Sequence, residues 1–189
     1  MSGRKFRQLL KIAKVIGAVK ERSICRTGEH MSKVHLNPKI QVIHGPNLNL
    51  LGTRDPSVYG TMTLNGINER LVVLAKENRA ELRAFQSNVE GEIINAIHAA
   101  TGWADGIIIN PGAFGVYAYA IADALAGTGL PAIEVQISNV QAREEWRSRS
   151  VLSPVIVGYI GGLGWHGYIL AVQGLLAVIE QRIGSALIA

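Results

Sequence analysis

Cysteine is almost absent from this sequence, with Cys25 as the only one among 189 residues. A lone cysteine excludes an intrachain disulfide framework and a cysteine-based metal site, and it fits a reducing compartment. The apolar core and small-residue cleavage site of a secretory signal are also missing. We therefore expect a cytoplasmic protein. His30, His35 and His98 lack the spacing of metal ligands, so we expect no metal site.

Charged side chains are absent from residues 150–179, which raises the question of a membrane span. The run is interrupted by proline, glycine and histidine at Pro154, Gly158, Gly161, Gly162, Gly164 and His166. We therefore expect no span. Residues 155–160 are predicted to be a buried strand, followed by a turn and an unusually apolar last helix. The lack of polar residues predicts that this helix packs against a neighbouring subunit.

Positive charge is unevenly spread along the chain, whose net charge is +5. Residues 1–39 carry ten Lys or Arg and two Glu, a net charge of +8, whereas the remainder carries nine basic and twelve acidic side chains, a net charge of −3. The basic character therefore belongs to the beginning of the chain. The remainder lacks the basic footprint of a nucleic-acid-binding protein.

Residues 1–38 are predicted to be a basic amphipathic extension ahead of one domain, residues 39–189. Apolar residues recur at helical spacing over 4–22, with Lys and Arg between them. Such a helix can lie on a membrane surface, bind an acidic partner or dock on its own domain, and transit peptides share its composition. We favour a solvated or self-docking helix. Met31 is a plausible alternative start, so part of the segment can be non-native.

Apolar β-rich runs alternate with helical patterns from residue 39 onward. The predicted strands are 39–43, 80–86, 105–109, 131–136 and 154–160. The predicted helices are 63–78, 89–101, 113–127, 140–148 and 164–182. This rhythm predicts an α/β, flavodoxin-like three-layer sandwich with a five-stranded parallel sheet. Ligands bind such sheets beyond the carboxyl ends of the strands, where the segments 44–60, 87–91, 110–117 and 137–147 are expected.

The segment between the first predicted strand and helix is about 18 residues long and is expected to have no element of its own. Loops of that length in compact domains are commonly functional. Arg54 lies five positions before Tyr59, and a cation beside a phenol favours the phenolate, so Tyr59 can serve as a general base. In the alternative interpretation, Arg54 caps a carboxylate and Tyr59 only packs.

The motif Gly45-Pro46-Asn47-Leu48-Asn49-Leu50-Leu51-Gly52, followed by Arg54 and Tyr59-Gly60, resembles the signature of type II 3-dehydroquinate dehydratases. The resemblance covers about residues 38–183 and includes 85–88, 109–113, 137–139, 142–145 and 162–164. It implies that a β-hydroxyketone ring loses water through an enolate, with no metal, cofactor or covalent intermediate. It also implies homotrimers, commonly assembled into dodecamers.

The resemblance implies a role for each matching residue. Tyr59 matches the base and Arg54 the arginine that activates it. Asn47 matches the residue that positions a water or the enolate, and Glu134 the acid that orients a catalytic histidine. The implied substrate-binding positions are Asn110, Val116, Asp123, Ile137, Ser138 and Arg147. On residue type alone, Asn110 can be a turn residue, Asp123 a solvated helix charge and Arg147 half of a surface ion pair. The free N–H groups at 137 and 138 lie before a predicted helix, where they suit an anion.

Four positions depart from the pattern that the resemblance implies. The proton-donating histidine is Gln136, and two further histidines are Val116 and Val89. A carboxamide cannot deliver a proton near neutral pH, and losing a positioned acid costs roughly 10²–10⁴ in rate. We expect a less polar pocket as a result. His44 stands where Asn is usual; it can supply a proton from another direction, although we favour a loop histidine satisfied by backbone.

Three hypotheses follow. In the first, a divergent lyase keeps the Tyr59–Arg54 base and acts on a cyclic or β-hydroxy carbonyl substrate less polar than 3-dehydroquinate, in a specialised pathway. In the second, the protein converts 3-dehydroquinate to 3-dehydroshikimate with His44 or water as a substitute acid. In the third, it is a non-catalytic binding or scaffold protein with the basic helix as its contact surface.

Overall fold

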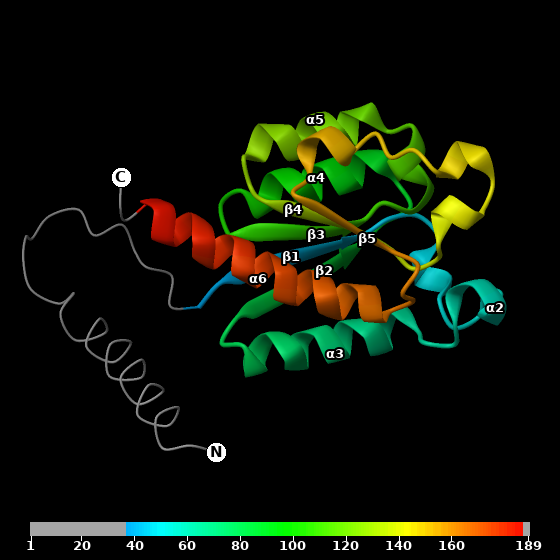
Figure 1. Ribbon diagram of the computed structural model, residues 1–189, viewed down its shortest axis with the longest axis horizontal. Coiled ribbons are helices and arrows are strands. Elements are labelled where there is room, and N and C mark those ends of the chain that lie inside the picture. The colour runs from blue at the N-terminus through cyan, green and yellow to red at the C-terminus, as the bar shows by residue number, and fades with distance from the viewer. Residues whose placement is uncertain (1–36, 187–189) are drawn as a thin grey trace, which may run out of the picture. The chain divides into compact units, whose positions relative to one another are not determined.

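The computed structural model describes residues 37–186. Five parallel strands form one sheet in the order β2-β1-β3-β4-β5 (Figure 1). Their bounds are β1 Lys39–His44, β2 Glu81–Gln86, β3 Gly106–Asn110, β4 Ala132–Gln136 and β5 Gly158–Gly161. This order is the flavodoxin-like one, so the predicted fold class is confirmed. The predicted extension, with its helix over 4–22, lies outside the described residues.

The helices cover both faces of the sheet. Their bounds are α2 Pro56–Tyr59, α3 Leu64–Glu77, α4 Glu90–Ala100, α5 Tyr119–Thr128 and α6 His166–Ala186. Short 3₁₀ turns lie at η1 Leu48–Leu50, η2 Gly112–Val116, η3 Val140–Ala142, η4 Glu145–Arg147 and η5 Ser153–Val155. Helices α3 and α6 pack on one face, and α4 and α5 on the other (Figure 1).

The central strands are apolar on both faces because successive side chains point in opposite directions. Ile40, Val42 and Ile108 join the cluster formed with α3 and α6. Ile43, Ile107 and Ile109 join the cluster formed with α4 and α5. All six are completely buried, so β1 and β3 are firmly held and give the loops at their carboxyl ends a rigid base.

Several predicted boundaries are wrong. The predicted helix at 140–148 is two 3₁₀ turns, because this charged segment offers no apolar stripe to bury. The stretch 113–116 also lies in a 3₁₀ turn, next to Pro111, and α5 begins only at Tyr119. The segment 44–60 contains η1 and α2 rather than no element.

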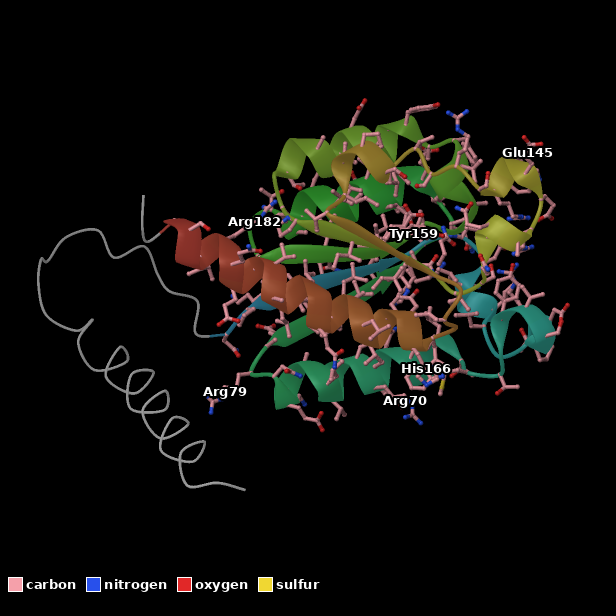
Figure 2. The ribbon with its side chains drawn as sticks, viewed as in Figure 1. Arg70, Arg79, Glu145, Tyr159, His166 and Arg182 are labelled. Atoms are coloured by element: carbon pink, nitrogen blue, oxygen red, sulfur yellow. The ribbon has the colours of Figure 1, made fainter. Side chains whose placement is uncertain are left out.

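The last strand is also shorter and more exposed than predicted. Strand β5 begins at Gly158, after the turn η5, and lies at the edge of the sheet. It is not the buried strand that the sequence predicted, since Tyr159 is 40% exposed (Figure 2). An edge strand has a neighbour on one side only, which leaves its outer side open.

Among residues 37–186, only α6 has the length and composition of a membrane-spanning helix. Its inner side is part of the sandwich core, where Tyr168, Ala171, Val172 and Leu175 are completely buried. Its outer side leaves Leu170 44% exposed. The apolar run therefore forms a core helix of this fold, and its predicted contact with another subunit stays a prediction.

Candidate active site

A pocket of about 150 Å³ opens beyond the carboxyl ends of β1, β3 and β4. Parallel α/β sheets bind ligands at this end. Its walls combine three arginines, other polar groups and apolar side chains: Pro46, Asn47, Leu48, Arg54, Tyr59, Asn110, Gly112, Ala113, Val116, Gln136, Ile137, Ser138, Val140, Arg143 and Arg147. No Asp or Glu is among these lining residues, so the pocket favours an anionic ligand.

Arg54 and Tyr59 contact each other as predicted. The Arg54 Nη2 donates to the Tyr59 hydroxyl at 2.9 Å, and the guanidinium carbon lies 3.9 Å from the ring centroid. Helix α2 sets this geometry, because Asp55 accepts from the Ser57 backbone N–H and Pro56 begins the helix. The alternative in which Arg54 only caps a carboxylate is therefore wrong.

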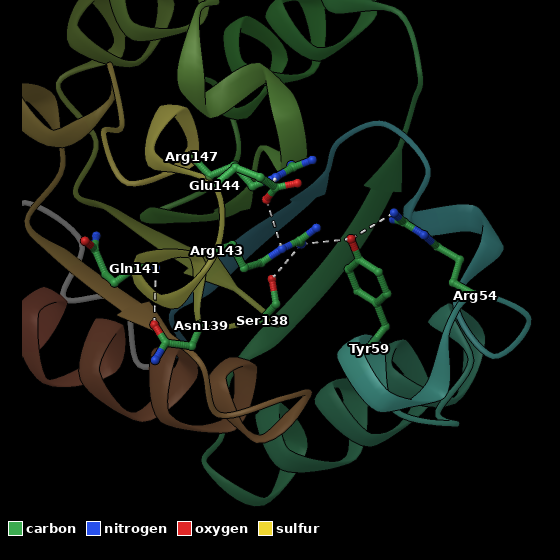
Figure 3. A network of polar contacts seen from close by, with 8 residues as sticks. All are labelled: Arg54, Tyr59, Ser138, Asn139, Gln141, Arg143, Glu144 and Arg147. Atoms are coloured by element: carbon green, nitrogen blue, oxygen red, sulfur yellow. Dashed lines mark hydrogen bonds and ion pairs between the residues drawn. The ribbon is translucent and has the colours of Figure 1, made fainter.

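Arg143 is a second cation on the same phenol, and the sequence reasoning missed it. Its Nη1 donates to the Tyr59 hydroxyl at 3.1 Å and to Ser138 Oγ at 3.3 Å (Figure 3). The hydrogen bond to Tyr59 raises the pKa of Arg143, so this guanidinium stays charged. The available signal was its position five residues after Ser138, in the same segment beyond β4.

Arg147 forms an ion pair, as its residue type allowed, and it also lines the pocket. Its Nε donates to Glu144 Oε2 at 2.7 Å (Figure 3). The same carboxylate oxygen lies 3.5 Å from Arg143 Nε. Glu144 is thus shared by two guanidinium groups at the pocket wall.

Asn47 is held in an unusual backbone conformation where two loops meet. Its φ is 64°, in the left-handed region that Asn tolerates better than most residues. Its backbone N–H donates to Asn88 Oδ1 at 2.8 Å. Next to it, a Cβ on Gly45 would lie 2.4 Å from the Pro111 carbonyl oxygen, so the approach of the two loops requires glycine. Such strain is common at functional sites.

The remaining predicted binding positions divide into two groups. Asn110, Val116, Ile137 and Ser138 line the pocket, and Asn110 is 1% exposed. Asp123 is exposed on α5 and does not line the pocket of its own chain. The helix predicted to follow Ile137 and Ser138 is absent, so a helix dipole does not support an anion there.

Glu134 and Gln136 form a pair at the end of β4. Gln136 Nε2 donates to Glu134 Oε1 at 3.1 Å, and Ser150 Oγ donates to Glu134 Oε2 at 2.6 Å. Burial raises the pKa of Glu134, and the two hydrogen bonds oppose that shift. Glu134 therefore orients the carboxamide of Gln136, which lines the pocket.

His44 is not the loop histidine that we favoured from the sequence. It is the last residue of β1 and is completely buried. Its ring nitrogens contact the Tyr168 hydroxyl and Asn68 Oδ1, both at 2.9 Å, rather than backbone groups. Burial lowers the pKa of His44 to about 4. A neutral ring that does not line the pocket cannot protonate a ligand there, so His44 as substitute acid is wrong.

Within residues 37–186, no three His, Cys, Asp or Glu side chains are clustered in a way that could hold a metal ion. The pocket presents a phenol between two guanidinium groups, with amides and apolar walls around it.

Comparison with known proteins places this chain in a family. The family model for Dehydroquinase class II matches residues 38–176. A 3-dehydroquinate dehydratase from Pelotomaculum thermopropionicum is 50% identical over 140 residues, 74% of this chain and 97% of its own length. One from Bacillus licheniformis is 53% identical over 136 residues, 72% of this chain and 94% of its own length.

A solved structure gives the same answer. The type II dehydroquinase from Butyrivibrio crossotus superposes with a TM-score of 0.72 at 46% identity, covering 74% of this chain and 97% of the other. This chain belongs to the class II dehydroquinase family, whose members are hydro-lyases.

Proposed function

We propose that the protein dehydrates 3-dehydroquinate to 3-dehydroshikimate, with Tyr59 as the base. The observation that carries the proposal is the contact of the Tyr59 hydroxyl with two guanidinium groups, those of Arg54 and Arg143. The identity of about 50% to 3-dehydroquinate dehydratases over most of the chain supports it further. Non-catalytic binding has no such observation in its favour.

In the proposed first step, the Tyr59 phenolate removes a proton alpha to the ring carbonyl. The Arg54 and Arg143 guanidinium groups both donate to the Tyr59 oxygen, so they would stabilise the negative charge that the base carries. The carbonyl oxygen becomes an enolate oxygen, and Asn47 holds a water against it. A donor fixed in place for that developing charge stabilises the transition state without reorganisation.

In the second step, the enolate re-forms the carbonyl, the carbon–carbon double bond forms and the hydroxyl leaves. The leaving hydroxyl takes up a proton and departs as water. Gln136 cannot provide this proton, and His44 lies outside the pocket. We therefore assign the proton to a water held by Gln136, whose amide Glu134 orients. The hydroxide that this water becomes takes the proton that Tyr59 removed from the substrate, which restores the base for the next turnover.

The substrate carboxylate is proposed to bind at Ile137 and Ser138, with Arg147 and Asn110 on the ring hydroxyls. Asp123 is exposed in the single chain and would reach a ligand only from another subunit. A trimer, and a dodecamer of trimers, would supply such a neighbour. Exposed Tyr117 and Tyr119 on the surface around η2 and α5 are consistent with an interface there.

A second candidate substrate is a less hydroxylated carbonyl compound of a specialised pathway. Val116 and Gln136 favour it, because they line the pocket where the resemblance implies histidines. Leu48, Ala113 and Val140 add to the apolar part of the wall. Apolar surface discriminates weakly between substrates, whereas missing hydrogen-bond partners for ring hydroxyls discriminate strongly.

The deciding experiment is steady-state turnover of 3-dehydroquinate by the purified chain, followed by the absorbance of the conjugated product. Saturable turnover supports the proposal, and rates like those of an ordinary family member would refute the changed substrate. Absence of turnover by folded enzyme, with dehydration of a β-hydroxyketone that lacks ring hydroxyls, would favour the second candidate.

A further inference from the structure

Four buried or partly buried side chains form a hydrogen-bonded series from the pocket to α3. Asn110 lines the pocket, Tyr168 lies behind it on α6, His44 ends β1 and Asn68 lies on α3. His44 and Asn110 are paired positions on neighbouring strands. His44 and Tyr168 are completely buried, so water cannot replace a bond that they lose.

The direction of hydrogen-bond donation along the series is fixed at the pocket end. The backbone N–H of Gly112 donates to Asn110 Oδ1 at 3.2 Å, and a backbone N–H can only donate. The amide nitrogen of Asn110 is therefore the group that donates to the Tyr168 hydroxyl, with which Asn110 shares a side-chain hydrogen bond. Burial raises the pKa of Tyr168, and the hydrogen bond from Asn110 opposes this shift, as a bond donated to the phenol oxygen does.

The rest of the series follows from that direction. With Asn110 donating to its oxygen, the Tyr168 hydroxyl can donate a hydrogen bond to His44 Nδ1, 2.9 Å away. His44 must then be neutral with its proton on Nε2, which donates to Asn68 Oδ1 at 2.9 Å. Asn68 Oδ1, at the far end, can only accept a hydrogen bond, and the Gly112 N–H, at the near end, can only donate one. Both ends of the series therefore require the same direction of donation.

We propose that His44 is a positioning residue that acts on the ligand through Tyr168 and Asn110. As the Nε2–H tautomer, His44 accepts a hydrogen bond from the Tyr168 hydroxyl at Nδ1. The Tyr168 oxygen then accepts from the Asn110 amide nitrogen, which keeps that amide from rotating by half a turn. A turned amide would set its nitrogen against the Gly112 N–H, donor against donor. The proposal rests on the proposed function for its kinetic consequence, but the tautomer of His44 does not depend on it.

The consequence for the ligand is a fixed donor. Asn110 uses its oxygen for Gly112 and one amide proton for Tyr168, so its second amide proton remains for the pocket. This proton suits a hydroxyl or carboxylate oxygen of the substrate. Because such a bond forms in ground state and transition state alike, its loss raises KM more than it lowers kcat.

The kinetic test compares variants of His44 on 3-dehydroquinate. His44→Leu removes the acceptor for Tyr168, so we expect KM to rise about tenfold, as for one lost hydrogen bond, with kcat changed less than about threefold. His44→Asn keeps an acceptor near the Nδ1 position and should hold KM within about twofold. His98→Leu, an exposed histidine on α4, is the matched control and should change neither constant.

A merely structural role would lower the amount of active enzyme and leave KM unchanged in both variants, and that result would overturn the proposal. If His44→Leu does not fold, Tyr168→Phe replaces it, with the same expected rise in KM.

Nitrogen NMR of the histidine side chains in the unmodified protein decides independently of activity. A neutral Nε2–H ring for His44 at pH 7 is expected. A protonated ring, or a proton on Nδ1, overturns the proposal even if 3-dehydroquinate is turned over. If the protein is inactive on 3-dehydroquinate, the proposed function fails while this spectrum still tests the tautomer.

Discussion

Arg143 Nη1 lies 3.1 Å from the Tyr59 hydroxyl oxygen, although the two residues are 84 positions apart. With Arg54 Nη2 at 2.9 Å, the phenol oxygen receives two charge-assisted hydrogen bonds. Arg54 reaches it from the segment after β1, and Arg143 from the segment after β4. The candidate base is therefore assembled only when the sheet brings these two segments together.

Replacing Arg143 should weaken the base without removing it. We expect Arg143→Met to lower kcat by about 10- to 100-fold, which corresponds to the loss of one charged hydrogen bond. Steady-state turnover of 3-dehydroquinate by Arg143→Met beside the parent enzyme measures this effect. A parent-like kcat for Arg143→Met would show that the Arg143 contact with Tyr59 does not contribute to the base.

Restoring the histidines should restore a proton donor. Glu134 lies 3.1 Å from the Gln136 amide, so it is placed to orient an imidazole at that position. We expect Gln136→His with Val116→His to raise kcat on 3-dehydroquinate, by at most roughly 10²–10⁴. Val89→His is the control, since Val89 does not line the pocket. If the double variant is no faster, proton delivery to the leaving hydroxyl was not limiting.

The stability of the fold should depend on His44 at mildly acidic pH. Burial lowers the pKa of His44 from 6.5 to about 4, so the unfolded chain binds this proton more readily. The part of the free energy of unfolding that depends on a neutral His44 is fully present above about pH 6.5 and is lost as the pH falls towards 4. The pKa difference corresponds to about 3 kcal/mol of unfolding free energy. The pKa of Glu134 is raised by burial, so its contribution to the free energy of unfolding changes with pH in the opposite direction.

Urea unfolding of the parent and His44→Asn between pH 4 and 7 isolates the histidine, because Glu134 is common to both. The parent should lose stability more steeply on acidification. Equal slopes would mean that His44 is not buried as a neutral ring.

The fold was readable from the sequence because its signals are local. Ile107, Ile108 and Ile109 form an apolar run of the kind found in central parallel strands, and Thr63 caps α3 through the Gly66 N–H. The Arg54–Tyr59 contact was predictable for the same reason, since both residues lie in one segment.

What the sequence could not give depends on contacts between distant segments. Arg143 looked like part of a charged helix, and only the 3₁₀ turns after β4 aim it at Tyr59. The surroundings of His44 come from α3 and α6, so its neighbours in sequence carried no signal. A single chain does not test the role of Asp123, because its proposed contact with a ligand needs a second subunit.

The most direct measurement is the turnover of 3-dehydroquinate by Tyr59→Phe beside the parent enzyme. Phenylalanine keeps the ring and removes the oxygen that Arg54 and Arg143 contact. The account predicts a fall in kcat of at least about 100-fold, with unfolding behaviour close to that of the parent. A folded Tyr59→Phe enzyme that keeps the parent kcat would contradict the assignment of Tyr59 as the base.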